Sequence, residues 1–460
     1  MHRFFLSLIL LVCSSAMLAV SPSGTLPVMY ITTKNNQAVS RETAVDATLY
    51  VTACGNYPAT GSESAQVPLT IKGRGNWTWT GFDKKPYKIV FAKGYGQKLL
   101  GMHKSKHWAL LAGADDYLGF LKNTVGYFLS EQIGLPFTPA QVPVELVLNG
   151  EYQGLYFVTE TIRVDNDRVN IHEQQDGGTD ATGVTGGWLV EIDNYYEEGN
   201  VVLQEHNGEY IMVTPHSPEV LSAAQRTYLT GQLDALNDAI YGQGVRPVQD
   251  ILDMTDAARF YLVQEIMEDC ESYHGSCFLY KDRDSTDTAG RQVVPKWHFG
   301  PVWDFGNAYD RHQERFIYDQ PSFSQIWIGQ LCRNQLFYEQ LMQLWYDYRS
   351  RGHSRVLADI DAFVSLISTA AKRDAERWQN SSNVCNNADM DDRKQAFLWR
   401  MNWRLDWLYS QWGEGYSTPV PEAVAQDAAA QRKAVVRLVD GRLLIERDGH
   451  LYTVTGVPVN

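Results

Sequence analysis

The spacing of apolar residues changes along this 460-residue chain, and the change restricts which folds it can adopt. Residues 27–93 contain four short apolar or alternating segments separated by Gly, Asn and Asp, and this pattern predicts β-strands. After Pro247 the apolar residues recur at helical spacing, as in DMTDAARFYLVQEIMEDCESY, which begins with a helix-capping pattern. These observations predict an α+β fold with mixed β-sheets and a helical C-terminal half.

Further elements are predicted between and after these regions. A helix is expected at about residues 118–132, where Gly134 and Pro136 end it. The segment PVELVLNGEYQGLYFVTETI predicts a hairpin that turns at Asn149-Gly150. A second hairpin is expected to begin at SCFLYKD and to return through KWHFG. The remaining strands and helices are expected at residues 186–193, 201–206, 337–346, 360–378 and 392–412.

Composition divides the chain into four regions. Residues 1–21 have the pattern of a secretory signal peptide, in which Arg3 precedes an apolar run and then small residues. Residues 27–412 are the predicted main domain, and residues 413–430 are a Pro/Ala-rich linker. Residues 431–460 predict three short strands joined by two Asp-Gly turns, a small C-terminal β-meander. This tail resembles the short C-terminal tails of secreted Bacteroidetes proteins, and an accessory meander is the alternative.

The signal peptide predicts an exported, extracytoplasmic protein that is secreted or held at the cell surface. Cleavage is expected near Ala19 or Ser21, and a lipoprotein attached through Cys13 is the alternative. No other stretch reaches the roughly 18 apolar residues that are needed to span a bilayer. We therefore expect no transmembrane segment.

Composition also narrows the classes of function. The formal net charge of −14 argues against a nucleic-acid-binding protein. The 13 Trp and 25 Tyr leave association with surface glycans or the cell envelope open. The five cysteines that remain after cleavage have no metal-ligand spacing, so we expect small buried apolar residues. A Cys270–Cys277 bridge is the alternative.

Two segments of the first half carry charged residues that suit phosphate binding. Glycines flank Arg74 in KGRGN, which lets backbone approach a ligand, and Lys85 and Lys88 follow on a predicted strand. A glycine turn with a solvated arginine is the alternative. Glu160 ends the apolar run LYFVTE and could pair with a strand lysine, whereas an ordinary strand end is the alternative.

Two segments of the second half carry carboxylates. Asp269 and Glu271 follow the helix that begins after Pro247, where they could act as a general base or bind a metal. A charged helix end is the alternative. In GPVWDFGNAYD, Trp303 presents a flat face to a base or a sugar, and Asp304 can bind a divalent cation. Asn307 and Asp310 add oxygen ligands, and this sparse set suits Mg²⁺ better than Ca²⁺.

Six motifs occur in the order GRGNWTW…KKPYKI, WALLAGADD…LKN, VELVLNGEYQGLYFVTE, GGWLVEID, FYLVQEIMEDCESYHGSCFLYKD and FGPVWDFGNAY. In this order the chain resembles the CotH kinase family, typified by spore coat protein H, over residues 27–412. The resemblance implies an atypical protein kinase-like fold that binds ATP and Mg²⁺ and phosphorylates protein Ser or Thr. The partner it implies is therefore a protein substrate.

The resemblance also implies roles for single residues. Trp303 is expected to stack on adenine, and Asp304 to bind Mg²⁺ as one of two catalytic carboxylates. The other is Glu271, which occupies the position of the family's essential Asp and is a second expected metal ligand. Arg74 and Lys85 are expected near the phosphates, and Glu160 is expected to orient a basic residue. Where the family commonly has Arg-Asn, this chain has Lys122-Asn123.

Two other functions remain open. A glycan-binding or glycan-cleaving protein would use the tryptophans and a carboxylate pair such as Glu271 and Asp304, in an open cleft without phosphate-binding basic groups. A non-catalytic surface scaffold would keep the fold while losing the site. In such a scaffold Lys85, Glu160 and Asp304 would be scattered rather than convergent.

Overall fold

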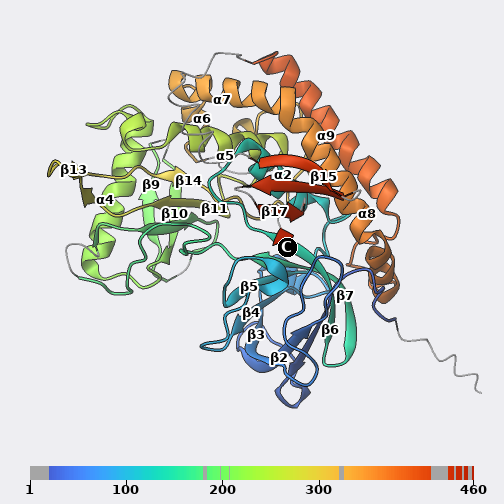
Figure 1. Cartoon of the computed structure of the whole chain (residues 1–460). Coiled ribbons are helices and arrows are strands. Elements are labelled where there is room, and N and C mark those ends of the chain that lie inside the picture. The colour runs from blue at the N-terminus through green and yellow to red at the C-terminus, as the bar shows by residue number, and fades with distance from the viewer. Residues whose placement is uncertain are drawn as a thin grey trace, which may run out of the picture.

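A computed structural model of the chain has two lobes (Figure 1). One lobe is a β-barrel, and the other combines a second sheet with most of the helices. The predicted α+β class is confirmed, while the atypical kinase-like fold stays a prediction. The structure describes residues 20–179, 184–196, 198–206, 208–320 and 326–415, and the strands of the C-terminal tail.

Seven strands form the closed barrel in the order β1-β2-β3-β4-β5-β7-β6. Alternate residues of β3 are buried, as a strand with one face toward a core requires. The predicted hairpin of β6 and β7 is confirmed, with Asn149 and Gly150 both at positive φ in its turn. Parallel pairing of β1 with β6 closes the barrel, and this closure was not predicted. The strands are β1 (Val28–Thr33), β2 (Val45–Val51), β3 (Val67–Gly73), β4 (Tyr87–Phe91), β5 (His107–Leu111), β6 (Gln141–Leu148) and β7 (Glu151–Glu160).

The second lobe contains a five-stranded antiparallel sheet in the order β14-β11-β8-β10-β9. The predicted hairpin of β11 and β14 is confirmed, and a small ribbon of β12 and β13 extends its loop. Cys277, in β11, has a free thiol, so the Cys270–Cys277 bridge does not form. The strands are β8 (Trp188–Ile192), β9 (Val201–Gln204), β10 (Tyr210–Ser217), β11 (Cys277–Lys281), β12 (Ser285–Thr286), β13 (Gln292–Val293) and β14 (His298–Phe299).

The helices of the second lobe share one apolar core with its sheet. Helix α8 packs on both β7 of the barrel and α2, so it joins the two lobes (Figure 1). The α-helices are α1 (Trp77–Thr80), α2 (Leu121–Ile133), α4 (Ala223–Ile240), α5 (Met254–Ile266), α6 (Ile328–Leu331), α7 (Gln335–Asp347), α8 (His353–Arg377) and α9 (Met390–Trp412). Short 3₁₀ turns cover Lys34–Asn36, Leu99–Gly101, Val248–Asp250 and Ile317–Asp319, and a π turn covers Tyr348–Gly352.

The predicted helices are confirmed, although α8 begins at His353 rather than at residue 360. The long helix α4 and the short helices α1 and α6 were not predicted. The start of α4 carries a capping box, in which Ser222 and Gln225 exchange hydrogen bonds between side chains and backbone. That pattern is a sequence signal that could have found the helix. Among the described residues, no helix combines the length and the apolar character that crossing a membrane requires.

The C-terminal tail is an antiparallel sheet of four strands, in the order β15-β16-β17-β18. The sequence predicted three strands, and the fourth is a two-residue strand that pairs with β17. The two Asp-Gly turns, residues 416–430 of the predicted linker and residues 431–433 of the predicted tail lie outside the described residues. The division into domain, linker and tail stays a prediction. The strands are β15 (Ala434–Val439), β16 (Arg442–Arg447), β17 (His450–Thr453) and β18 (Pro458–Val459).

A buried ion pair fixes α9 against the end of α5. The guanidinium of Arg404 contacts the carboxylate of Glu265, and neither side chain is exposed. Arg404 also donates hydrogen bonds to the backbone oxygens of Glu265, Gln313 and Arg315, at 3.0, 3.0 and 2.8 Å. Its donors therefore bind two chain segments, the end of α5 and residues 313–315. Because α5 leads directly to Glu271, this network positions the segment that carries that residue.

Replacing Arg404 by Met should lower the free energy of unfolding by about 3–5 kcal/mol, because the Glu265 carboxylate would stay buried without its cation. Urea denaturation measures this loss. Lys394→Met, on the same helix, is the matched control and should cost less than about 1 kcal/mol, since its partners Asp361 and Asp391 are exposed. Equal losses in the two variants would contradict the role of Arg404.

Candidate functional site

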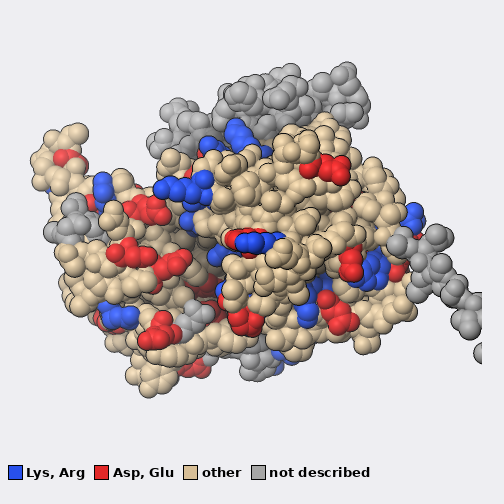
Figure 2. Space-filling view, turned by 90° about the horizontal axis from the view of Figure 1, so that it is seen from below, with Lys and Arg blue, Asp and Glu red and all other residues tan. Residues whose placement is uncertain are grey.

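A pocket of about 760 Å³ is lined by residues of both lobes. Its walls come from the Arg74 turn after β3, the loop after β5, the first turn of α2, the ends of β8 and β10, and the segment after β14. Four of the six predicted site residues line it: Arg74, Glu271, Trp303 and Asp304. On the face of the molecule seen in Figure 2, basic and acidic side chains are interspersed over the surface.

The first turn of α2 holds the segment that carries Asp304. Asp304 has a φ of 60°, a left-handed conformation that is unfavourable for a residue with a β-carbon. The next residue, Phe305, donates its backbone N–H to Asn123 Oδ1 at 3.0 Å. The Phe305 ring fills a notch beside Gly126, where a β-carbon would lie 2.2 Å from the ring. The segment is therefore held on α2 by both backbone and side chain.

Lys122 holds the same segment further along the chain, after Phe305. Its nearly buried ammonium donates to the Gly306 carbonyl at 2.8 Å and to Asp310 Oδ1 at 2.6 Å. The hydroxyl of Tyr117 donates to the same Asp310 oxygen at 3.0 Å. The Lys122-Asn123 pair, which stands where the family commonly has Arg-Asn, thus clasps the segment that follows Asp304, at Phe305, Gly306 and Asp310.

A second carboxylate, Asp115, lies close to Asp304. A β-carbon at Gly306 would lie 3.2 Å from Asp304 Oδ1 and 3.9 Å from Asp115 Oδ2, so the glycine leaves open a space that borders both carboxylates. Burial and the negative charges of Asp116 and Asp304 together raise the pKa of Asp115 to about 6. Sequence reasoning did not select Asp115, although it lies in the motif WALLAGADD.

Two amide side chains hold Glu271 in the pocket wall. Asn194 Nδ2 donates to Glu271 Oε1 at 2.7 Å, and the Asn307 amide donates to Oε2. Burial raises the pKa of Glu271, and the nearby Asp304 carboxylate also raises it. Because Asn307 lies three residues after Asp304, one segment supplies both the exposed carboxylate and a donor to Glu271.

Basic residues line another part of the pocket. The Arg74 guanidinium lies 5.5 Å from the centroid of the Trp303 ring, within range of a cation–π contact. Burial lowers the pKa of Arg74, while Asp304 acts in the opposite direction. Burial also lowers the pKa of His107 to about 4, and the positive charges of Arg163 and Lys88 contribute. The pocket thus combines carboxylates with a cluster of positive charge.

The other two predicted residues, Lys85 and Glu160, lie outside the pocket lining. Lys85 Nζ donates to the backbone oxygen of Trp79 at 2.6 Å. Glu160 is buried, accepts a hydrogen bond from the backbone N–H of Ala140 at 3.2 Å and contacts His103 Nδ1 at 3.3 Å. Its neighbours thus include a basic ring, but it is not paired with Lys85. The roles of both residues stay predictions.

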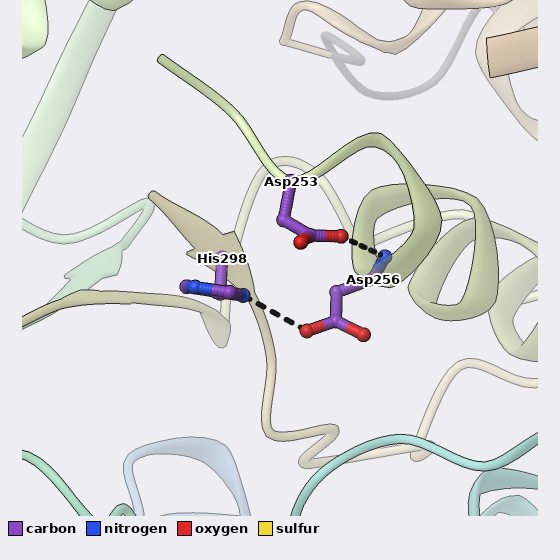
Figure 3. A group of neighbouring side chains, drawn as sticks. All are labelled: Asp253, Asp256 and His298. Carbon is purple, nitrogen blue, oxygen red and sulfur yellow. Dashed lines mark hydrogen bonds and ion pairs between the residues drawn. The ribbon is translucent and has the colours of Figure 1, made fainter. Parts of the chain in front are cut away.

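A separate group of possible metal ligands lies at the start of α5 (Figure 3). Asp253 caps the helix by accepting the backbone N–H of Asp256 at 2.9 Å. Asp256 contacts His298 Nδ1 and Arg259 NH1, each at 2.8 Å. Burial would raise the pKa of Asp256, but His298 and Arg259 lower it overall. These carboxylates already have partners within the protein and line no part of the pocket, so helix capping and ion pairing account for them.

The family comparison agrees with the order of the sequence motifs. The family model described as CotH kinase protein matches residues 71–407. The chain belongs to the CotH kinase family. The match includes every pocket residue discussed above, from Arg74 to Asp310. No curated protein sequence matches the chain. Membership of the CotH family makes this a kinase-like protein, and the secreted Bacteroidetes type stays a prediction.

The clasp on Asp304 can be tested through Lys122. Lys122→Met should lower the free energy of unfolding by about 1.5–3 kcal/mol, because Gly306 and Asp310 would lose a charged hydrogen-bond donor. Lys122→Arg should retain most of that stability, because it restores the charge. Lys88→Met is a control at an exposed lysine of the same pocket and should cost about 0.5 kcal/mol or less. Urea denaturation measures these losses. An equal loss of unfolding free energy in Lys122→Met and Lys88→Met would contradict the role of Lys122 in holding the segment.

Proposed function

We propose that this CotH-family protein is an exported kinase that binds ATP with Mg²⁺ and transfers phosphate to Ser or Thr of a protein substrate. The observation that carries the proposal is the pairing of Asp304 with Asp115 in the same pocket as the Arg74–Trp303 contact. This arrangement offers oxygen ligands for a cation, positive charge for phosphates and a flat ring for a base.

The residues present fit Mg²⁺. This ion binds through one or two carboxylates and completes its shell with waters and phosphate oxygens. Asp304 and Asp115 supply two carboxylates that border one open space, and Glu271 is a further carboxylate linked to them through Asn307. When bound, the cation would neutralise negative charge on the phosphate oxygens. It would also relieve the repulsion that raises the pKa of Asp115.

The residues also fit a nucleotide. The Trp303 ring can stack on adenine, since every base has a flat face. Arg74 contacts this ring, and its charge also faces Asp304, so it lies between the proposed base and metal sites. Lys88 adds a second cation to the pocket. Cations and donors in fixed positions stabilise the charge that develops during phosphoryl transfer.

Glu271 is the residue proposed to accept the proton of the acceptor hydroxyl. The amides of Asn194 and Asn307 each donate to one of its oxygens, so the carboxylate is held in a defined orientation. A positioned base contributes only if it lies within hydrogen-bond reach of the proton that it removes. Glu271 lines the pocket, so a hydroxyl of a protein substrate that enters the pocket could meet it there.

A nucleotide-binding or non-catalytic scaffold is the second candidate, and one observation favours it. Lys85 and Glu160 lie outside the pocket that contains Asp304, so the three residues do not converge as expected of an active kinase. The glycan alternative has less support. Trp77 and Tyr195 are exposed at the pocket, at 67% and 50%, as sugar-stacking rings would be. However, the basic residues of the pocket suit phosphate better than a neutral sugar.

Isothermal titration calorimetry on the mature chain tests nucleotide binding. We expect ATP binding that requires Mg²⁺ and collapses in Asp304→Asn, because the amide removes a charged ligand. Trp303→Ala should weaken binding by about 1–3 kcal/mol through loss of stacking. Asp361→Asn and Trp399→Ala change exposed residues outside the pocket and are the matched controls. Unchanged affinity in Asp304→Asn would overturn the metal assignment.

The acceptor role of Glu271 is tested by single-turnover transfer from radiolabelled ATP. Glu271→Gln should lower the transfer rate about 10²- to 10⁴-fold while ATP affinity stays nearly unchanged, because the amide cannot take the proton. Glu271→Asp restores the family's usual residue, and faster autophosphorylation would mark the natural protein as an attenuated kinase. ATP binding without transfer in every variant would favour the scaffold.

A further inference from the structure

Lys84, the neighbour of Lys85, has an unusual environment. Its side chain is fully buried, yet it belongs to the wall of the pocket. Its Nζ lies 2.7 Å from Asp374 Oδ1 of α8, whose side chain is 2% exposed. Within the described chain, the ammonium makes no other hydrogen bond. An ammonium has three donors, so two of them have no acceptor in the protein.

The surroundings hold this ion pair in place. The rings of Phe120 and Tyr156 lie 5.3 and 5.2 Å from Lys84 Nζ and confine the ammonium. Asp374 Oδ1 also accepts the backbone N–H of Leu155 in β7 at 2.8 Å. A β-carbon at Gly154 would lie 2.0 Å from that oxygen, so the Asp374 carboxylate can occupy this position only because residue 154 is glycine. The lysine and its partner are thus fixed by both lobes.

A buried ammonium with unused donors is costly unless an acceptor reaches it. Lys84 is part of the pocket wall, so a ligand in the pocket would lie next to this residue. An anionic oxygen suits the site, because it would satisfy both the charge and the remaining donors. Burial lowers the pKa of Lys84, and the negative charge of Asp374 partly offsets this lowering.

We propose that Lys84 binds a phosphate group of the nucleotide and that Asp374 holds its ammonium in position. This inference rests on the proposed function and deepens it, because it assigns the phosphate contact to Lys84 rather than to Lys85. Lys85 points elsewhere: its ammonium donates to Trp79 and lies 5.5 Å from the ring of that residue. The two adjacent lysines therefore give the assignment a direct test.

The test compares Mg²⁺–ATP with adenosine as calorimetric probes. Lys84→Met alone would leave the Asp374 carboxylate buried and unpaired, so it risks unfolding the protein. The double variant Lys84→Met/Asp374→Asn removes both charges and keeps an oxygen that accepts the Leu155 N–H. We expect this variant to fold and to bind Mg²⁺–ATP about 10- to 100-fold more weakly, as for loss of a charged hydrogen bond. Adenosine, which has no phosphate, should bind as in the wild type.

The competing assignment is tested in parallel with Lys85→Met, for which we expect wild-type affinity. ATP binding by the double variant at wild-type strength would overturn the role of Lys84 and leave the proposed function standing. An equal loss for adenosine and ATP would also overturn it, because the effect would then be structural. Absence of ATP binding by the wild-type protein would overturn the proposed function and this inference together.

Discussion

The geometry of the site depends on how the first turn of α2 holds the segment after β14. Asp304 adopts a left-handed backbone, which costs energy and persists only where neighbours fix it. Asn123 fixes the residue that follows, and Lys122 fixes Gly306 and Asp310. Asn307 of the same segment also donates to Glu271. The contacts between α2 and this segment therefore orient the carboxylates of both Asp304 and Glu271.

The pocket concentrates like charges, and this has consequences for what it can bind. Burial and repulsion from neighbouring carboxylates raise the pKa values of Asp115 and Glu271, so full ionisation of these two pocket carboxylates is disfavoured. A divalent cation reverses that balance because it stabilises the ionised forms. The neighbouring Arg74 can then meet the negative charge that a cation would bring with its phosphates. The carboxylates and the arginine are complementary to the cation and to the phosphates of one ligand.

Local sequence patterns predicted the parts of this fold that local interactions determine. The first four strands, the Asn149-Gly150 turn and the helices of the second half follow from alternation, turn residues and helical spacing. Closure of the barrel did not, because β1 and β6 pair across a long separation that leaves no mark in either segment. The same limit applies to the site. Motif order identified Trp303 and Asp304. Asp115 could be recognised as a site residue only from the structure, in which it and Asp304 both lie beside Gly306.

The pair of lysines at 84 and 85 shows why convergence of a site cannot be judged from single predicted residues. Both follow the same short turn, and the sequence gives no reason to prefer either. Their difference arises from Asp374, which lies far along the chain and draws one ammonium into the interior. The absence of Lys85 from the pocket is therefore weak support for a scaffold, since an equivalent charge already borders it. Glu271, which stands where the family has Asp, is likewise weak support for a scaffold. The amides of Asn194 and Asn307 each donate to one oxygen of Glu271, so its carboxylate keeps a defined position despite the extra methylene group.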